Sequence, residues 1–98
     1  MRVVWSRQAS EQFAGAFAYL AAERPAVALR WLERVLERVA SLAAFPDQGR
    51  LVPELQRSDM RELLIPPYRV IYRRDESEVI VVTIRHERRE LGHDDAVG

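Results

Sequence analysis

The stretch PAVALRWLERVLERVASLA, from Pro25 to Ala43, has the strongest periodicity in this chain of 98 residues. Its apolar residues recur every three or four positions and form one stripe: Ala28, Leu32, Val35, Leu36, Val39, Leu42 and Ala43. The opposite face carries charged residues: Arg30, Glu33, Arg34, Glu37 and Arg38. Pro25 suits the first turn of a helix, where its missing N–H costs nothing. The stretch therefore predicts an amphipathic helix with a solvated outer face of ion pairs.

A second helix precedes this one. Large apolar residues recur at helical spacing between Arg7 and Glu23: Phe13, Phe17 and Leu20. Ser6 is a good N-cap for this segment, because its hydroxyl can accept a hydrogen bond from a free backbone N–H. Only Arg24 lies between this segment and Pro25. The two helices must therefore form an antiparallel hairpin.

The pattern changes after Phe45–Gly49, where a loop begins. Three short runs rich in β-branched and aromatic residues follow: 61–65, 68–73 and 79–84. Their connections, Pro66-Pro67 and Arg74–Glu78, are too short to join anything but antiparallel neighbours. Val3–Trp5 is expected to add a fourth strand. We therefore expect an α+β fold, with the helical hairpin on one face of a small, twisted, mostly antiparallel sheet. The other sheet face, or a groove beside it, is expected to stay open.

The composition indicates one folded domain that spans residues 1–98, with a frayed tail at 92–98. The chain is 48% apolar and 31% charged, a balance typical of globular rather than disordered proteins. It has no cysteine and no apolar run that could span a bilayer, and so we expect a cytoplasmic protein without membrane contact. His86 and His93 alone do not make a convincing metal site, and glycine-rich phosphate loops are absent. No metal or cofactor is expected.

All 15 basic residues are arginines, and they balance 15 acidic residues. The zero net charge argues against nucleic acid as a bulk electrostatic partner. Near the end of the chain, arginines alternate with glutamates from Arg85 to Glu90, a mixture that favours contact with a protein. We expect the following arginines to bind a partner: Arg61, Arg69, Arg73, Arg85, Arg88 and Arg89.

The order of these elements, together with several motifs, resembles the RelE/ParE family of toxins. The motifs are Trp5-Ser6, the bend at Pro25, Pro46-x-x-Gly49-Arg50, Arg61-Glu62-Leu63, Tyr68-Arg69-Val70-Ile71-Tyr72 and Ile84–Leu91. The similarity extends from about Val3 to Leu91. It implies a toxin of a bacterial type II toxin–antitoxin module, held silent by a labile antitoxin that folds around it.

The resemblance implies two possible targets. RelE-like members cleave messenger RNA on the ribosome, whereas ParE-like members inhibit DNA gyrase through protein contacts. Two absences favour the gyrase branch: RelE's lysines have no counterpart here, and no aromatic residue follows His86. The ending from His86 to Leu91 also resembles the ParE pattern. A degenerate, non-toxic interaction domain is the third possibility.

A nuclease would draw its catalytic residues from Glu54, Arg69 and His86. RNA cleavage needs a base, an acid and a cation beside the phosphorus. The resemblance places Arg69 next to the family's phosphate-binding arginine and Glu54 where some nucleases carry a glutamate. His86 can act as acid or base near neutral pH. The alternatives are an Arg69–Glu62 ion pair, a solvated Glu54 and a structural His86.

Strand alternation places Arg69, Ile71 and Arg73 on one sheet face, with Tyr68, Val70 and Tyr72 on the other. We expect the Arg69 strand and the tail to remain available to another molecule. Under the nuclease hypothesis, Arg69→Ala should then abolish toxicity at little cost in stability.

Overall fold

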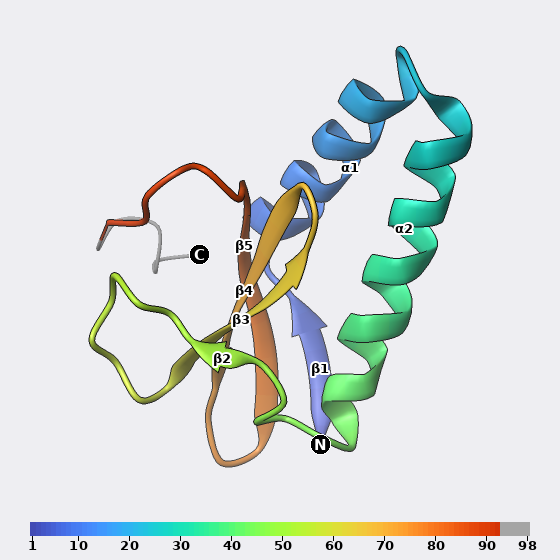
Figure 1. Ribbon diagram of the computed structural model, residues 1–98. Coiled ribbons are helices and arrows are strands. Elements are labelled where there is room, and N and C mark those ends of the chain that lie inside the picture. The colour runs from blue at the N-terminus through green and yellow to red at the C-terminus, as the bar shows by residue number, and fades with distance from the viewer. Residues whose placement is uncertain (93–98) are drawn as a thin grey trace.

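In the computed structural model, which describes residues 1–92, two helices cover one face of a five-stranded sheet (Figure 1). The helices are α1 (Arg7–Ala21) and α2 (Pro25–Ala40), and the 3-10 turn η1 (Ser41–Ala43) extends the second. The predicted α+β fold with its helical hairpin is confirmed. Of the tail expected to fray, residues 93–98 lie outside the described residues.

Ser6 anchors the hairpin to the sheet. Its hydroxyl oxygen accepts a hydrogen bond from the amide of Ala9 at 3.0 Å, as the N-cap prediction requires. The same hydroxyl donates to the carbonyl of Val82 at 2.9 Å. The cap that starts α1 therefore also fixes the helix against a central strand.

The strands follow the order β1-β5-β4-β3-β2. Their bounds are β1 (Arg2–Trp5), β2 (Arg50–Leu51), β3 (Met60–Ile65), β4 (Tyr68–Arg74) and β5 (Glu78–His86). β1 runs parallel to β5, while the other neighbours are antiparallel. The expected count of four strands was wrong by one, because β2 has only two residues and no pattern of its own.

The main core lies between the sheet and the helices, where Trp31, Val35 and Leu42 pack against Val70 and Tyr72. The predicted alternation along β4 is thereby confirmed, since Ile71 belongs to a separate cluster on the opposite face.

The opposite face carries that second apolar cluster, which contains Val52, Leu55, Met60, Ile71, Val82 and Leu91. Val52 and Leu55 belong to the loop between β2 and β3, and Leu91 belongs to the segment after β5. The expectation that this face stays open was therefore wrong in part. Two loop segments fold over it because each brings apolar side chains that the sheet surface can bury.

The outer face of α2 also differs from expectation. Within residues 1–92, its arginines and glutamates form no ion pair within 4.0 Å with one another or with other elements. Residues four apart on this face carry the same sign, and the pairs of opposite sign three apart, Arg30–Glu33 and Arg34–Glu37, are not within 4.0 Å of each other.

Candidate functional site

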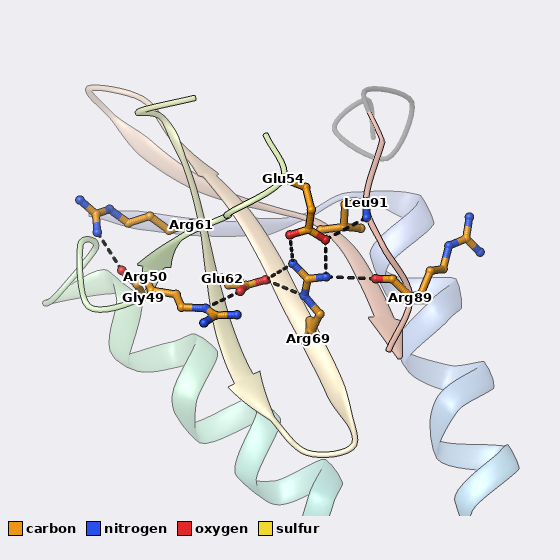
Figure 2. A network of polar contacts seen from close by, with 8 residues as sticks. All are labelled: Gly49, Arg50, Glu54, Arg61, Glu62, Arg69, Arg89 and Leu91. Atoms are coloured by element: carbon orange, nitrogen blue, oxygen red, sulfur yellow. Dashed lines mark hydrogen bonds and ion pairs between the residues drawn. The ribbon is translucent and has the colours of Figure 1, made fainter. Parts of the chain in front are cut away.

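Arg69 lies at the centre of a polar network on the sheet face away from the helices (Figure 2). Its Nε donates to Oε1 of Glu62 at 2.7 Å, and its Nη1 and Nη2 each donate to a carboxylate oxygen of Glu54 at 2.8 Å. Nη1 also donates to the carbonyl of Arg89 at 3.0 Å, and Nη2 lies 2.7 Å from Oε1 of Glu62. Every nitrogen of the guanidinium therefore has an oxygen partner inside the chain.

The side chain of Arg69 is 6% exposed and that of Glu62 is fully buried. The expectation that Arg69 is open to another molecule was wrong, because the Glu54 loop and the segment after β5 cover it. The alternative, an ion pair with Glu62, is confirmed. Glu62 also accepts a 2.6 Å hydrogen bond from Nε of Arg50, so the buried carboxylate lies between two arginines.

The sequence did not single out Arg50 as a member of this site. It lies directly opposite Glu62 in the β2–β3 pairing, and its side chain reaches the network from the solvent side. The signal was present in the Pro46-x-x-Gly49-Arg50 motif. Its use required knowledge of the β2 register, which the sequence pattern does not provide.

Glu54 ties two loop segments together. Its Oε2 accepts a hydrogen bond from the amide of Leu91 at 3.0 Å in addition to the bonds from Arg69. The Arg69 hydrogen bonds lower the pKa of Glu54 from 4.5 to about 2, with burial opposing and the Leu91 amide assisting. The same carboxylate, followed by Glu62, raises the pKa of Arg69. We call these four side chains, Arg50, Glu54, Glu62 and Arg69, the clamp.

His86 does not join the clamp. It pairs with Tyr68 across β4 and β5, and its ring lies 5.7 Å from the ring of Tyr68. Tyr68 packs against the helix-side core, whereas Arg69 faces the other way. The Nδ1 of His86 accepts a hydrogen bond from the amide of Arg88 at 3.2 Å, a local structural contact. The structure therefore brings Glu54 and Arg69 together and leaves His86 on the opposite side of the sheet.

The remaining arginines expected to bind a partner differ in their surroundings. Arg61 is half-buried, and its Nη1 donates to the carbonyl of Gly49 at 2.8 Å, which fixes the loop before β2 (Figure 2). Arg73 and Arg85 are half-buried on β4 and β5, and Arg88 and Arg89 are exposed. The exposed pair thus has the best access to a partner.

A shallow hollow of about 330 Å³ adjoins the clamp, lined by Arg50, Glu54, Leu64, Arg69, Glu87 and Arg88. Among residues 1–92, no group of three or more histidine, aspartate or glutamate residues could hold a metal ion. Within the same residues, no helix is both long and apolar enough to cross a membrane.

Comparison with known proteins gives a consistent result. Residues 3–91 match the family described as the ParE toxin of type II toxin-antitoxin system, parDE. Toxin RelE2 of Caulobacter vibrioides is 33% identical over 89 residues, which are 90% of this chain and 97% of the relative. A solved structure titled "Chromosomal ParDE TA system from P. aeruginosa" has the same fold, with a TM-score of 0.72 at 21% identity. It matches 88% of this chain and 95% of its own. This chain therefore belongs to the ParE toxin family and is a toxin of the ParE/RelE type.

Proposed function

We propose that this toxin inhibits DNA gyrase by protein contact and that it is not a ribonuclease. The observation that supports the proposal is the closed clamp. A ribonuclease would need the guanidinium of Arg69 beside the scissile phosphate, where its charge could stabilise the transition state. Glu54 and Glu62 already occupy that guanidinium. A phosphate would have to displace both carboxylates, one of which is buried.

The other two candidate catalytic residues add to this argument. A carboxylate whose pKa is about 2 is a weak general base near neutral pH, so Glu54 is poorly suited to take a proton from a ribose hydroxyl. His86 lies across the sheet from Glu54 and Arg69, out of reach of a shared substrate. A protein inhibitor needs none of these groups.

Family membership implies an antitoxin partner, and the gyrase proposal places the toxin in the cytoplasm with its target. Arg88 is the main proposed contact with the target, because it is exposed and lines the hollow beside the clamp, and the exposed Arg89 follows it in the chain. The alternative, ribosome-dependent cleavage of messenger RNA, draws support from the adjacency of Glu54 and Arg69. It requires the clamp to open on the ribosome.

Two assays on the purified toxin separate these functions. In the first, gyrase supercoils relaxed plasmid in the presence of increasing toxin, and we expect supercoiling to fall and to recover when antitoxin is added. In the second, ribosomes translate a defined messenger RNA, and primer extension should give no new 5′ ends. Normal supercoiling together with new 5′ ends would establish the ribonuclease instead. Normal supercoiling together with no new 5′ ends would indicate a degenerate domain.

Arg88→Ala should weaken the inhibition of gyrase, because it removes an exposed cation beside the clamp. Arg7→Ala is the matched control, since Arg7 is an exposed arginine on α1. Equal inhibition by both variants would remove Arg88 from the proposed contact.

A further inference from the structure

Arg50 is an exposed arginine that the clamp holds in place. Its side chain is 56% exposed, yet its Nε donates a 2.6 Å hydrogen bond to the fully buried carboxylate of Glu62 (Figure 2). This bond uses one of the five N–H groups of the guanidinium. Within residues 1–92, no hydrogen bond or ion pair joins the terminal nitrogens of Arg50 to any residue other than Glu62. Arg50 therefore has donors that are fixed in position and available to an acceptor from outside.

Arg88 adds a second set of donors. It is exposed in the segment after β5, and its side chain forms no ion pair or hydrogen bond with another residue of the described range 1–92. Arg50 and Arg88 both line the hollow of about 330 Å³ beside the clamp. Leu64, which is 42% exposed, also lines it and lies on the sheet face of Glu62, two residues away on β3. The hollow thus combines two guanidinium groups with one apolar side chain.

The carboxylates around the hollow leave these donors unoccupied. Glu54 accepts hydrogen bonds from both terminal nitrogens of Arg69, and Oε1 of Glu62 accepts another from its Nε. Glu87 lines the hollow, but no ion pair within 4.0 Å joins it to either of the two exposed arginines. With the buried Glu62 included, the three arginines of the hollow are balanced by three glutamates. The hollow therefore has little net charge to attract a polyanion such as DNA, but it lacks an acceptor for two guanidinium groups.

We propose that this hollow binds one carboxylate side chain of the target protein, with the terminal nitrogens of Arg50 as the main donors. Arg88 is the second donor, and Leu64 contacts an apolar side chain next to that carboxylate. An arginine can bind a carboxylate through two parallel N–H···O bonds. The bond to Glu62 already restricts the side chain of Arg50, which lowers the entropy cost of docking. The inference rests on the proposed inhibition of gyrase by protein contact and adds the chemistry of that contact.

The test compares Arg50→Lys and Glu87→Gln with the unaltered toxin in the gyrase supercoiling assay. A lysine at position 50 keeps the charge that pairs with Glu62 but lacks the fork for a second carboxylate. We expect its half-inhibitory concentration to rise about tenfold, the effect of losing about one charge-assisted hydrogen bond. Its urea midpoint should stay close to that of the unaltered toxin.

Glu87→Gln should have the opposite effect. It removes a negative charge beside the bound carboxylate and should lower the half-inhibitory concentration about two- to threefold. A loss of folded protein can only weaken inhibition, so this gain separates docking from a structural role. Leu64→Ser alters an exposed side chain outside the clamp and should weaken inhibition, which keeps the test decisive if Arg50→Lys fails to fold.

Arg7→Lys is the matched control. Arg7 also pairs with a glutamate, Glu11, but it lies on α1, away from the hollow. Its half-inhibitory concentration should equal that of the unaltered toxin. Equal inhibition by Arg50→Lys and the unaltered toxin, or weaker inhibition by Glu87→Gln, would overturn the proposal. So would a gel shift in which the toxin binds duplex DNA and Arg50→Lys does not, because it would assign the donors to phosphate.

A second readout separates this proposal from the gyrase proposal. If the unaltered toxin leaves gyrase active, the proposed function fails, and growth inhibition in cells without antitoxin then tests the hollow. Weaker growth inhibition by Arg50→Lys together with stronger inhibition by Glu87→Gln would still support a carboxylate contact with a protein target. Equal growth inhibition by both variants and the unaltered toxin, or none by any of them, would overturn it.

Discussion

Replacement of Arg69 by alanine should destabilise this protein severely. The substitution leaves the buried carboxylate of Glu62 with only Arg50 and removes the two hydrogen bonds that Arg69 donates to Glu54. The carbonyl of Arg89 also loses its donor. Removing one partner of a buried ion pair costs about 3–5 kcal/mol. Since the free energy of unfolding of a small domain is only about 5–15 kcal/mol, the substitution removes a large share of it.

Urea unfolding followed by tryptophan fluorescence measures this loss in the free energy of unfolding. In thermal unfolding of a domain of this size, each kcal/mol lowers Tm by about 4–8 °C, so Tm should fall by about 12 °C or more. Arg69→Met combined with Glu62→Leu is the matched variant. It removes the buried charge together with its partner and should be less damaging than Arg69→Ala, because a buried pair can often be replaced by apolar side chains.

A free energy of unfolding for Arg69→Ala within about 0.5 kcal/mol of the unaltered protein would refute this reasoning, since that is the range of ordinary surface substitutions. The prediction also reverses the sequence-based expectation that this substitution costs little stability. If Arg69→Ala abolishes toxicity, the loss has a structural explanation. It would therefore not identify Arg69 as catalytic.

Three further perturbations test the loops around the clamp. The folded pKa of Glu54, about 2 against its ordinary 4.5, means that its contribution is complete above pH 4.5 and disappears as the pH falls towards 2. After a discount for solvent screening, the contribution of Glu54 to the free energy of unfolding is about 1–2 kcal/mol. The urea midpoints of Glu54→Gln and of the unaltered protein should therefore differ at pH 7 and converge near pH 2. Gly49→Ala should lower the unfolding free energy by about 1–3 kcal/mol in the same assay, because overpacking strains its neighbours. A Cβ there would lie 2.6 Å from the carbonyl oxygen of Glu62, and equal stability would contradict this packing. Tyr72→Phe removes a 2.7 Å bond to the carbonyl of Pro46 and a 3.0 Å bond from the amide of Gly49. It should cost about 1–3 kcal/mol and accelerate hydrogen exchange at the Gly49 amide, whereas unaltered exchange would show that the hydroxyl does not hold the loop.

The helical hairpin and the main sheet were predictable because their side chains repeat with the period of the element that they form. Ser6, the bend at Pro25 and the alternation from Tyr68 to Tyr72 each depend on residues close together in the chain. Such local signals can be recognised in the sequence without knowledge of the tertiary structure. β2 gave no such signal, because two residues cannot show a period.

The candidate site was predictable only in part, since its geometry depends on contacts between distant segments. Alternation placed Arg69 on the correct face, and the sequence also allowed its ion pair with Glu62. Its burial could not be foreseen, because Glu54 and Arg89 reach it from loops that lie 15 and 20 residues away in the chain. The same limitation applies to His86, whose side of the sheet follows from its pairing with Tyr68.

The parallel pairing of the first strand with the last has a consequence for how the toxin is made. Arg2 pairs with Glu78 and Trp5 with Val81, so the sheet cannot close until nearly the whole chain has left the ribosome. Contacts so distant in sequence form slowly. During synthesis the emerging polypeptide therefore lacks the strand that β1 pairs with in the finished sheet. An antitoxin present in the cell can therefore meet the toxin chain while that chain is still being translated, before its sheet is complete.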